Sequence, residues 1–225
     1  MIFRNLLLYS IFIPSALLGI NTGMIMETMG ISNNDLVEII NKIETVSKIA
    51  EKNWSEYYYF LPDMINKYGY QEGAEIGVAF GAHSRRILDG TNIKKLWGID
   101  PYFPNLFCNF HTQNEADIFY YWVLDKMLIF GDRYKLLRDF ANKAKLQFKN
   151  ESLDFIFIDG DHSYEGVRDD LNNWVSKVRT GGLVCGDDYN TIWPGVPRAV
   201  NEFISKNSYA LNFACNNRVW WFIKK

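Results

Sequence analysis

The sequence predicts a doubly wound α/β fold with a mostly parallel sheet of seven strands, the last of which runs antiparallel. Beyond Gly69, short apolar runs repeat along the chain, each followed by a Gly or Asp turn and a helical stretch. Strands that alternate with helices form βαβ units and pair in parallel. The uncharged run from Phe155 to Ile158 is typical of a strand covered on both faces. We therefore expect the sheet to lie between two layers of helices.

The first 70 residues are expected to form an apolar segment and a helical extension, and residues 71–225 the α/β domain. Apolar residues recur at three- and four-residue spacing over 34–52, which predicts an amphipathic helix. A second helix is expected over 56–68, ending at Gly69.

The α/β part is expected to contain five parallel strands and a closing hairpin. Strands are predicted at 73–78, 95–99, 134–137, 153–158 and 182–185, and helices at 84–88, 114–130, 141–148, 164–178 and 196–207. Residues 209–214 and 218–225 are separated only by a short turn, which is typical of a β-hairpin. The last strand should therefore run antiparallel to its neighbour.

Composition and charge narrow the function classes. The chain has 24 Lys and Arg against 26 Asp and Glu, a net charge of −2, so neither a nucleic-acid arm nor a polybasic membrane patch is expected. A hydrophobic content of 48% is that of an ordinary globular protein. Cys108, Cys185 and Cys215 are scattered, and indicate neither a disulfide framework nor a zinc site.

The N-terminal segment does not decide where in the cell the protein is located. Residues 6–20 carry no charge and follow Arg4, which is the pattern of a signal peptide or anchor, although no clean cleavage site follows. The alternatives are a hydrophobic helix docked on the body or a start assigned too early. Membrane contact through residues 5–20 stays open, and we expect a cytoplasmic protein.

The loop after the first strand is a candidate cofactor site. Ligands of open parallel sheets bind at the carboxyl ends of the strands. Here the candidate binding residues are Glu75, Gly77, Phe80, Gly81 and Ser84, which lead into a helix N-terminus. The glycines form G-x-x-x-G, whereas the dinucleotide fingerprint is G-x-G-x-x-G, so a nicotinamide or flavin cofactor is disfavoured.

Asp100 ends the second strand, 23 residues beyond Gly77. An acid at this position accepts ribose hydroxyls in nucleoside-binding α/β folds. The alternative roles are a tight turn for the glycines and a cap for Asp100. Together the two strand ends favour adenosine binding.

Acidic residues follow the next two strands. Asp159, Asp161 and His162 follow the fourth strand, and Asp187 and Asp188 the fifth. Neighbouring strands lie about 5 Å apart, so these carboxylates should converge, and their repulsion requires a cation or shared protons. Oxygen ligands without a thiolate suggest Mg²⁺, with Ca²⁺ or Mn²⁺ as alternatives, rather than zinc. The alternatives are a helix cap for Asp161 and turn positions for Asp187 and Asp188.

Several runs together resemble the class I S-adenosylmethionine-dependent methyltransferases, in particular the bacterial macrocin- and aminocoumarin-type sugar O-methyltransferases. The runs are 75–81, Asp100, LDFIFIDGDHSY at 153–164 and TGGLVCGDDY at 180–189. The resemblance extends over roughly residue 73 to the C-terminus, and implies a Rossmann-like methyltransferase fold.

The resemblance also implies a role for each matching residue. Glu75, Gly77 and Gly81 would line the methionine and ribose of S-adenosylmethionine, Asp100 the ribose, and Asp139 the adenine. Asp159 would contact the cofactor and, with Asp187 and Asp188, hold Mg²⁺. Asp161 would be the base, with His162 as the rival base.

The expected reaction is methyl transfer to a hydroxyl of a small molecule such as a sugar or polyol. Two alternatives stay open: a nicotinamide-dependent oxidoreductase and a nucleotide-binding module without catalysis. The insert at 101–122 could cover the crevice and shape the acceptor pocket, with 103–111 as the lid candidate. For the aromatic run at 118–122, core packing of a helix across the sheet is the favoured alternative. A homodimer through the N-terminal helices is also possible on this pattern.

Overall fold

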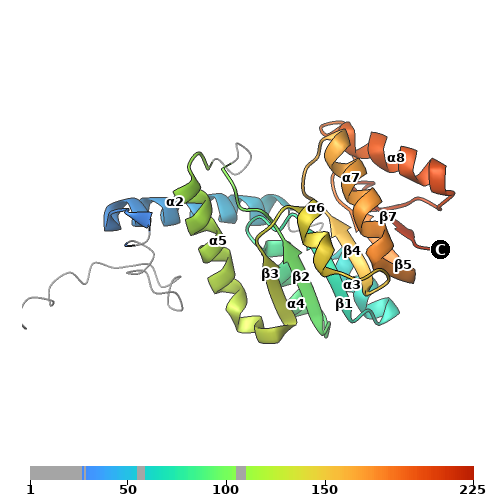
Figure 1. Cartoon of the computed structure of the whole chain (residues 1–225), viewed down its shortest axis with the longest axis horizontal. Coiled ribbons are helices and arrows are strands. Elements are labelled where there is room, and N and C mark those ends of the chain that lie inside the picture. Colours follow the sequence, from blue (N-terminus) through green and yellow to red (C-terminus); the bar gives the residue numbers. More distant parts are fainter. Residues whose placement is uncertain (1–26, 28, 55–58, 105–109) are drawn as a thin grey trace, which may run out of the picture.

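A computed structural model describes residues 27, 29–54, 59–104 and 110–225, and these form an α/β structure around one seven-stranded sheet (Figure 1). The strand order is β3-β2-β1-β4-β5-β7-β6. Strands β1 to β5 pair in parallel, and β7 runs antiparallel to both β5 and β6. The strands are β1 (Glu72–Ile76), β2 (Lys95–Ile99), β3 (Tyr134–Leu137), β4 (Leu153–Ile158), β5 (Val178–Gly186), β6 (Asn212–Ala214) and β7 (Val219–Ile223). The predicted fold class is confirmed.

Helices cover both faces of the sheet. One layer contains α2 (Asn33–Trp54), α3 (Phe60–Tyr68), α4 (Ala82–Gly90) and α5 (Gln113–Met127). The other contains α6 (Ala141–Ala144), α7 (Tyr164–Trp174) and α8 (Gly195–Asn207). Figure 1 shows α2 and α5 at one end of the molecule and α8 at the other.

Strand β4 shows why its sequence is apolar throughout. Phe155 and Phe157 belong to the core beneath the first layer, whereas Ile156 and Ile158 belong to the core beneath the second. Successive side chains of a strand point to opposite faces, so a strand with helices on both sides needs an apolar residue at every position.

Several element ends differ from the predicted ones for local reasons. β1 ends at Ile76 because Gly77 adopts a φ of +87°, outside the extended region. The helices predicted to end at 130 and 178 end as α-helices at Met127 and Trp174, and each continues as a 3₁₀ turn (Leu128–Arg133 and Val175–Lys177). β5 is longer than predicted.

The helical extension packs on the sheet. Leu36 and Ile40 of α2 and Leu61 of α3 share a buried cluster with Leu96 of β2. The apolar segment at 6–20, the start of the helix predicted over 56–68 and most of the predicted lid lie outside the described residues. Among the helices that are described, none has the length and apolar character needed to cross a bilayer.

Candidate active site

A cavity of about 950 Å³ opens at the carboxyl ends of the parallel strands. Its walls come from the loops after β1, β2, β3, β4 and β5 and from the start of α7 and α8. This is the edge where open α/β sheets bind their ligands. The candidate residues were predicted at this edge, and most of them line the cavity: Glu75, Gly77, Phe80, Asp100, Asp159, Asp161, His162, Asp187 and Asp188.

The loop after β1 is held by its two glycines. Gly77 has a φ of +87°, and a Cβ there would collide with the main chain of Asp159. Gly81 has a φ of +74° and begins α4. Glycine adopts these conformations without steric cost. The two positions therefore let the chain turn sharply between β1 and α4 beside the cavity.

Glu75 is buried and hydrogen-bonded beneath this loop. Its carboxylate accepts a hydrogen bond from the Ser84 hydroxyl and lies 2.8 Å from His83 Nδ1. His83 is buried and packs against Phe157 in a tilted arrangement, with ring centroids 4.4 Å apart, so it is not a surface residue. Ser84 does not line the cavity, and its hydroxyl lies 3.3 Å from the hydroxyl of Tyr134. Its observed contacts position Glu75.

Asp100 joins the first two strand ends. One carboxylate oxygen accepts hydrogen bonds from the backbone N–H groups of Val78 and Ala79, both at 3.0 Å, and the other accepts from the N–H of Tyr102 at 2.9 Å. Burial raises the pKa of this carboxyl, while the three backbone bonds act in the opposite direction. Asp100 thus fixes the glycine loop and faces the cavity at the same time.

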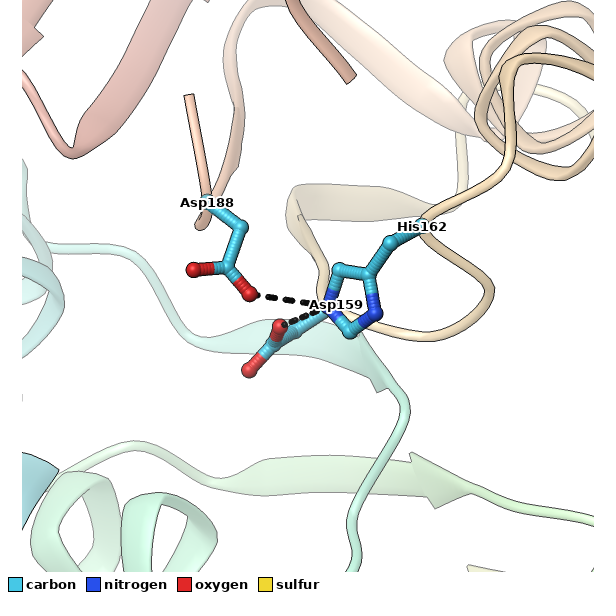
Figure 2. Close-up of side chains that lie close together, drawn as sticks. All are labelled: Asp159, His162 and Asp188. Atoms are coloured by element: carbon cyan, nitrogen blue, oxygen red, sulfur yellow. Dashed lines mark hydrogen bonds and ion pairs between the residues drawn. The ribbon is translucent and has the colours of Figure 1, made fainter. Parts of the chain in front are cut away.

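Asp159, His162 and Asp188 form a compact cluster (Figure 2). His162 Nε2 lies 3.3 Å from Asp159 Oδ1 and 2.9 Å from Asp188 Oδ2. Trp193 stacks on the imidazole with ring centroids 4.6 Å apart. The ring is therefore held in one orientation, with one nitrogen directed at two carboxylates.

The pKa values of the cluster are shifted. Burial alone would lower the pKa of His162, but its hydrogen bonds to Asp159 and Asp188 outweigh this effect and raise the pKa to about 10. Burial raises the pKa of Asp159 to about 7. For Asp188, the hydrogen bond from His162 and the charge of Arg218 outweigh burial and lower the pKa. At neutral pH, His162 is therefore an imidazolium between two acids.

Asp187 pairs with Arg218, a residue that was not among those predicted from the sequence. Arg218 Nη2 donates to Asp187 Oδ2 at 2.7 Å and Nε donates to Oδ1 at 2.8 Å, and Nη2 lies 3.3 Å from Asp188 Oδ1. A bidentate pair of this kind is strong and directional. Two protein cations, Arg218 and His162, therefore offset the carboxylate repulsion for which a metal was expected.

The place of Arg218 beside the acidic residues depends on how the C-terminal hairpin pairs with β5. Gly186 of β5 pairs with Trp220 of β7 in the antiparallel register. Continuing that register by two residues places Arg218 opposite Asp188, and the backbone N–H of Tyr189 donates to the Arg218 carbonyl at 2.9 Å. The predicted hairpin contains Arg218, but a hairpin pattern does not specify its register against β5.

The other candidate residues have contacts of their own. Asp161 is exposed, and its Oδ1 accepts from the backbone N–H of Ser163 at 2.8 Å, a turn contact before α7. The N-cap of α7 is Ser163 itself, whose hydroxyl accepts from the N–H of Gly166 at 3.0 Å. Asp139 Oδ1 accepts from the N–H of Phe140 at 2.8 Å. Asp139 and Gly81, like Ser84, are not among the residues that line the cavity.

The start of the insert forms one wall. Tyr102 is buried with a φ of +42°, and its hydroxyl donates to the carbonyl of Ala79 at 2.9 Å. Phe103 and Phe140 are exposed at the rim with ring centroids 5.4 Å apart. Phe119 and Trp122 of the aromatic run are buried in the core, as the packing alternative for this run required.

Comparison with known proteins identifies the class. The family described as "Methyltransferase domain" matches residues 74–189, which contain the first glycine loop and both acidic strand ends. The chain belongs to this family, and its fold is that of the class I S-adenosylmethionine-dependent methyltransferases. The match favours this class over the nicotinamide-dependent alternative.

Individual relatives are distant. The chain is 28% identical over 163 residues to an uncharacterized protein of Acanthamoeba polyphaga mimivirus, a match of 66% of this chain and 67% of that protein. A Staphylococcus aureus structure with the provisional description caffeoyl-CoA O-methyltransferase matches with a TM-score of 0.60 at 14% identity, over 91% of this chain and 98% of that one.

Two further solved structures share the fold. An O-methyltransferase from Bacillus cereus in complex with SAH matches with a TM-score of 0.57 at 16% identity, over 90% and 96% of the two chains. The O-methyltransferase NovP matches with a TM-score of 0.52 at 19% identity, over 73% and 76%. At these identities the likeness shows the fold.

Proposed function

We propose that this methyltransferase transfers the methyl group of S-adenosylmethionine to a hydroxyl of a small molecule such as a sugar or polyol. The observation that carries the proposal is the Asp159–His162–Asp188 cluster, which lies in the same cavity as the glycine loop and Asp100. A group that accepts a proton is thereby close to a site suited to a nucleoside cofactor. The three solved structures named above, which are described as O-methyltransferases, support the choice of oxygen.

In this proposal the cofactor lies across the strand ends. Its ribose hydroxyls donate to Asp100, and its methionine part passes the loop at Gly77. The sulfonium methyl then points towards His162 and the end of β5. Residues 71–225 form the catalytic domain, and residues 1–70 an extension of it. The cytosol is the proposed location because S-adenosylmethionine is made there.

The reaction is a direct displacement. The acceptor oxygen attacks the methyl carbon, the carbon–sulfur bond breaks, and its electron pair stays on sulfur, which leaves a thioether. The enzyme must hold the oxygen in line at roughly 3 Å and remove its proton. We assign that proton to the carboxylates of the Asp159–His162–Asp188 cluster, first of all to Asp159, whose pKa is raised to about 7. The assignment of Asp161 as base stays a prediction, because one of its oxygens already accepts from Ser163.

The donor set fits a divalent ion only in part. Asp159, His162 and Asp188 each offer one ligand atom within 4.8 Å of the other two. Asp187, the third predicted Mg²⁺ ligand, is engaged through both oxygens by Arg218. In the metal-assisted form of the proposal, Asp159 and Asp188 would hold the ion, and His162 would have to lose its proton to serve as a nitrogen ligand. A bound ion would lower the pKa of the acceptor hydroxyl. A mixed nitrogen and oxygen set suits Mn²⁺ or Zn²⁺ better than Mg²⁺, which prefers oxygen ligands.

Titration calorimetry with the full-length chain tests the cofactor. We expect S-adenosylhomocysteine to bind with micromolar affinity and NAD⁺ to give no heat. Repeating the titration with Mg²⁺ or Mn²⁺ and with EDTA tests the metal-assisted form. Binding of NAD⁺ alone would overturn the cofactor assignment. Activity that is unchanged in EDTA would rule out the metal-assisted form.

Turnover with hydroxylated sugars tests the cluster. We expect His162→Gln to lower kcat by about a hundredfold while binding of S-adenosylhomocysteine changes little, because the imidazolium holds in place the carboxylates of Asp159 and Asp188. General base catalysis by such a carboxylate is typically worth 10²–10⁴-fold. His111→Gln is the matched control, because His111 is exposed and does not line the cavity. Undiminished turnover of His162→Gln would show that the proton goes elsewhere, and the same assay on Asp161→Ala would test the rival base.

A further inference from the structure

Two residues in the wall of the cavity have a left-handed backbone conformation, which glycine adopts more readily than any other residue. Ala79 has a φ of +45° and Tyr102 a φ of +42°, and both residues line the cavity. A side chain makes this conformation costly, so it persists only where the surrounding contacts hold it. Strained residues of this kind cluster at functional sites, which points to a function for this wall.

The two strained residues hold each other in place. The Tyr102 hydroxyl donates to the carbonyl oxygen of Ala79 at 2.9 Å. Asp100 lies between them, because one of its carboxylate oxygens accepts from the N–H of Ala79 at 3.0 Å and the other from the N–H of Tyr102 at 2.9 Å. The loops after β1 and β2 are therefore joined through Asp100 and also directly, through the Tyr102 hydroxyl.

Tyr102 is fixed from its other side by Arg138, which follows β3. Arg138 Nη2 donates to the carbonyl oxygen of Tyr102 at 2.9 Å and also to the carboxylate of Asp117 of α5. The Tyr102 ring packs edge-on against Phe119 and Tyr120 of the same helix, with centroids 5.3 and 5.5 Å apart. Tyr102 is therefore anchored to β3 and α5, while its hydroxyl reaches the loop after β1.

The Tyr102 hydroxyl holds a part of that loop that Asp100 does not reach. Asp100 accepts from the N–H groups of Val78 and Ala79, so it holds the peptide groups that precede these two residues. The next peptide group, which links Ala79 to Phe80, is held through its carbonyl. Within the described part of the chain, Tyr102 is the one donor to this carbonyl. Without the hydroxyl, this peptide group can rotate and release the strain at Ala79.

We propose that Tyr102 is a positioning residue that keeps the loop after β1 in its cofactor-binding shape. This role rests on the proposed function, in which the methionine part of S-adenosylmethionine passes the same loop at Gly77. The strain at Ala79 favours other shapes of the loop, and the Tyr102 hydroxyl opposes them. When only a fraction of a protein has the binding-competent shape, its apparent affinity is reduced by that fraction. Tyr102 therefore acts on cofactor affinity without contacting the reacting atoms.

Calorimetry with S-adenosylhomocysteine and the full-length chain tests this role in Tyr102→Phe, which removes only the hydroxyl. We expect the affinity to fall about fivefold, the size expected for one hydrogen bond between neutral groups. Hydrogen exchange over residues 77–81 should be faster in the free variant than in the free wild type. It should return to the wild-type rate when S-adenosylhomocysteine saturates the variant, because the ligand selects the competent shape.

Tyr70→Phe is the matched control. Tyr70 is 2% exposed, as Tyr102 is, and its hydroxyl also donates to a backbone carbonyl, that of Gly181 at 3.5 Å. Tyr70 precedes β1 at the amino ends of the strands and does not line the cavity. The control removes the same atom from a buried tyrosine, and it should change neither the affinity nor the exchange over residues 77–81.

Ala79→Gly tests whether the strain is the cause. Glycine adopts a positive φ without steric cost, so the loop then depends less on the Tyr102 hydroxyl. In a double-mutant cycle, the affinity lost on Tyr102→Phe should be smaller in the Ala79→Gly background than in the wild type. An equal loss in the two backgrounds would contradict a role of Tyr102 through Ala79.

Arg138→Lys is a second variant, in case the phenylalanine variant does not fold. Lysine keeps the charge but lacks the planar group that contacts Tyr102 and Asp117 together. The affinity for S-adenosylhomocysteine should therefore fall in this variant as well.

The outcomes separate the two proposals. If the wild type does not bind S-adenosylhomocysteine, the proposed function falls and the role of Tyr102 falls with it. If the wild type binds and Tyr102→Phe keeps the full affinity, only the role of Tyr102 is overturned. Equal losses of affinity in Tyr102→Phe and Tyr70→Phe would assign the effect to general packing, and would overturn the role as well.

Discussion

The two ends of the cavity stabilise their carboxylates in different ways. At the β1 and β2 end, Asp100 accepts three backbone N–H groups and Glu75 accepts from Ser84. At the β4 and β5 end, Asp187 and Asp188 face the cations of Arg218 and His162. Backbone donors are fixed by the turn that contains them, whereas side-chain cations can move. In the proposed function, the rigid first end therefore suits cofactor binding and the second end suits proton exchange.

The strongest test of this difference removes the cation at the second end. Arg218→Met leaves the charge of Asp187 unpaired while keeping an unbranched side chain. Breaking a buried pair on one side typically costs about 3–5 kcal/mol, and the exposure of 24% at Arg218 places our expectation near 3 kcal/mol. Urea unfolding monitored by circular dichroism measures it.

The same variant sharpens the metal question. With Asp187 released from Arg218, the three aspartates predicted as metal ligands become available together, so we expect Mn²⁺ to raise the Tm of Arg218→Met more than that of the wild type. Arg168→Met is the control, because Arg168 pairs with the exposed Asp169. In the urea experiment, a loss of unfolding free energy below about 0.5 kcal/mol for Arg218→Met would contradict the difference between the two ends of the cavity.

At the first end, Asp100→Ala should have a smaller effect on stability and a larger one on binding. Three backbone N–H groups lose their acceptor, and water in the cavity can replace part of it, so we expect a loss of about 2 kcal/mol. Binding of S-adenosylhomocysteine should fall below detection in calorimetry. Asp89→Ala, at an exposed i,i+4 pair with Arg85, should change neither. Retained binding by Asp100→Ala would argue against a ribose contact.

The smallest expected effect is the change in stability on substitution of Asp170, a buried residue of α7 that lines the cavity, and this effect depends on pH. Its pKa is raised to about 7 in the folded protein, from 3.8, because the carboxyl is buried. The folded state therefore binds the proton more tightly, and the stability that this provides is present below pH 4 and is lost as the pH rises to about 7. Water in the cavity moderates the effect, so we expect Asp170→Asn to gain about 1 kcal/mol over the wild type between pH 5 and 7. Urea unfolding across this range checks it, and a pH-independent difference would contradict it.

Most of the fold could be predicted because its strands, helices and turns correspond to patterns of residues close together in the sequence. Apolar runs such as 153–158 appear as strands, and the positive φ at Gly77 lies where the glycine pattern placed a turn. The pairing of Asp187 with Arg218 was not predicted, because the two residues are 31 positions apart and meet only through the register of β7 against β5.

The sequence also marks Asp170, because an acidic residue stands there among the buried positions of a helix. A search for apolar periodicity alone does not consider this feature. Val167, Leu171 and Trp174 mark the buried face of α7, and position 170 belongs to that face. A charged residue at a buried helical position is unfavourable unless it is paired or serves a ligand. Its presence there is informative, but only the packing of α7 on the sheet shows that the described residues provide no partner.

The position of β7 has a consequence for how the site is made. β7 lies inside the sheet between β5 and β6, yet it follows every other strand in the chain. As a ribosome releases the chain, the strand ends that carry Asp159, Asp187 and Asp188 emerge before Arg218. The nascent protein therefore passes through an interval in which β5 is an open sheet edge and Asp187 lacks the cation of Arg218.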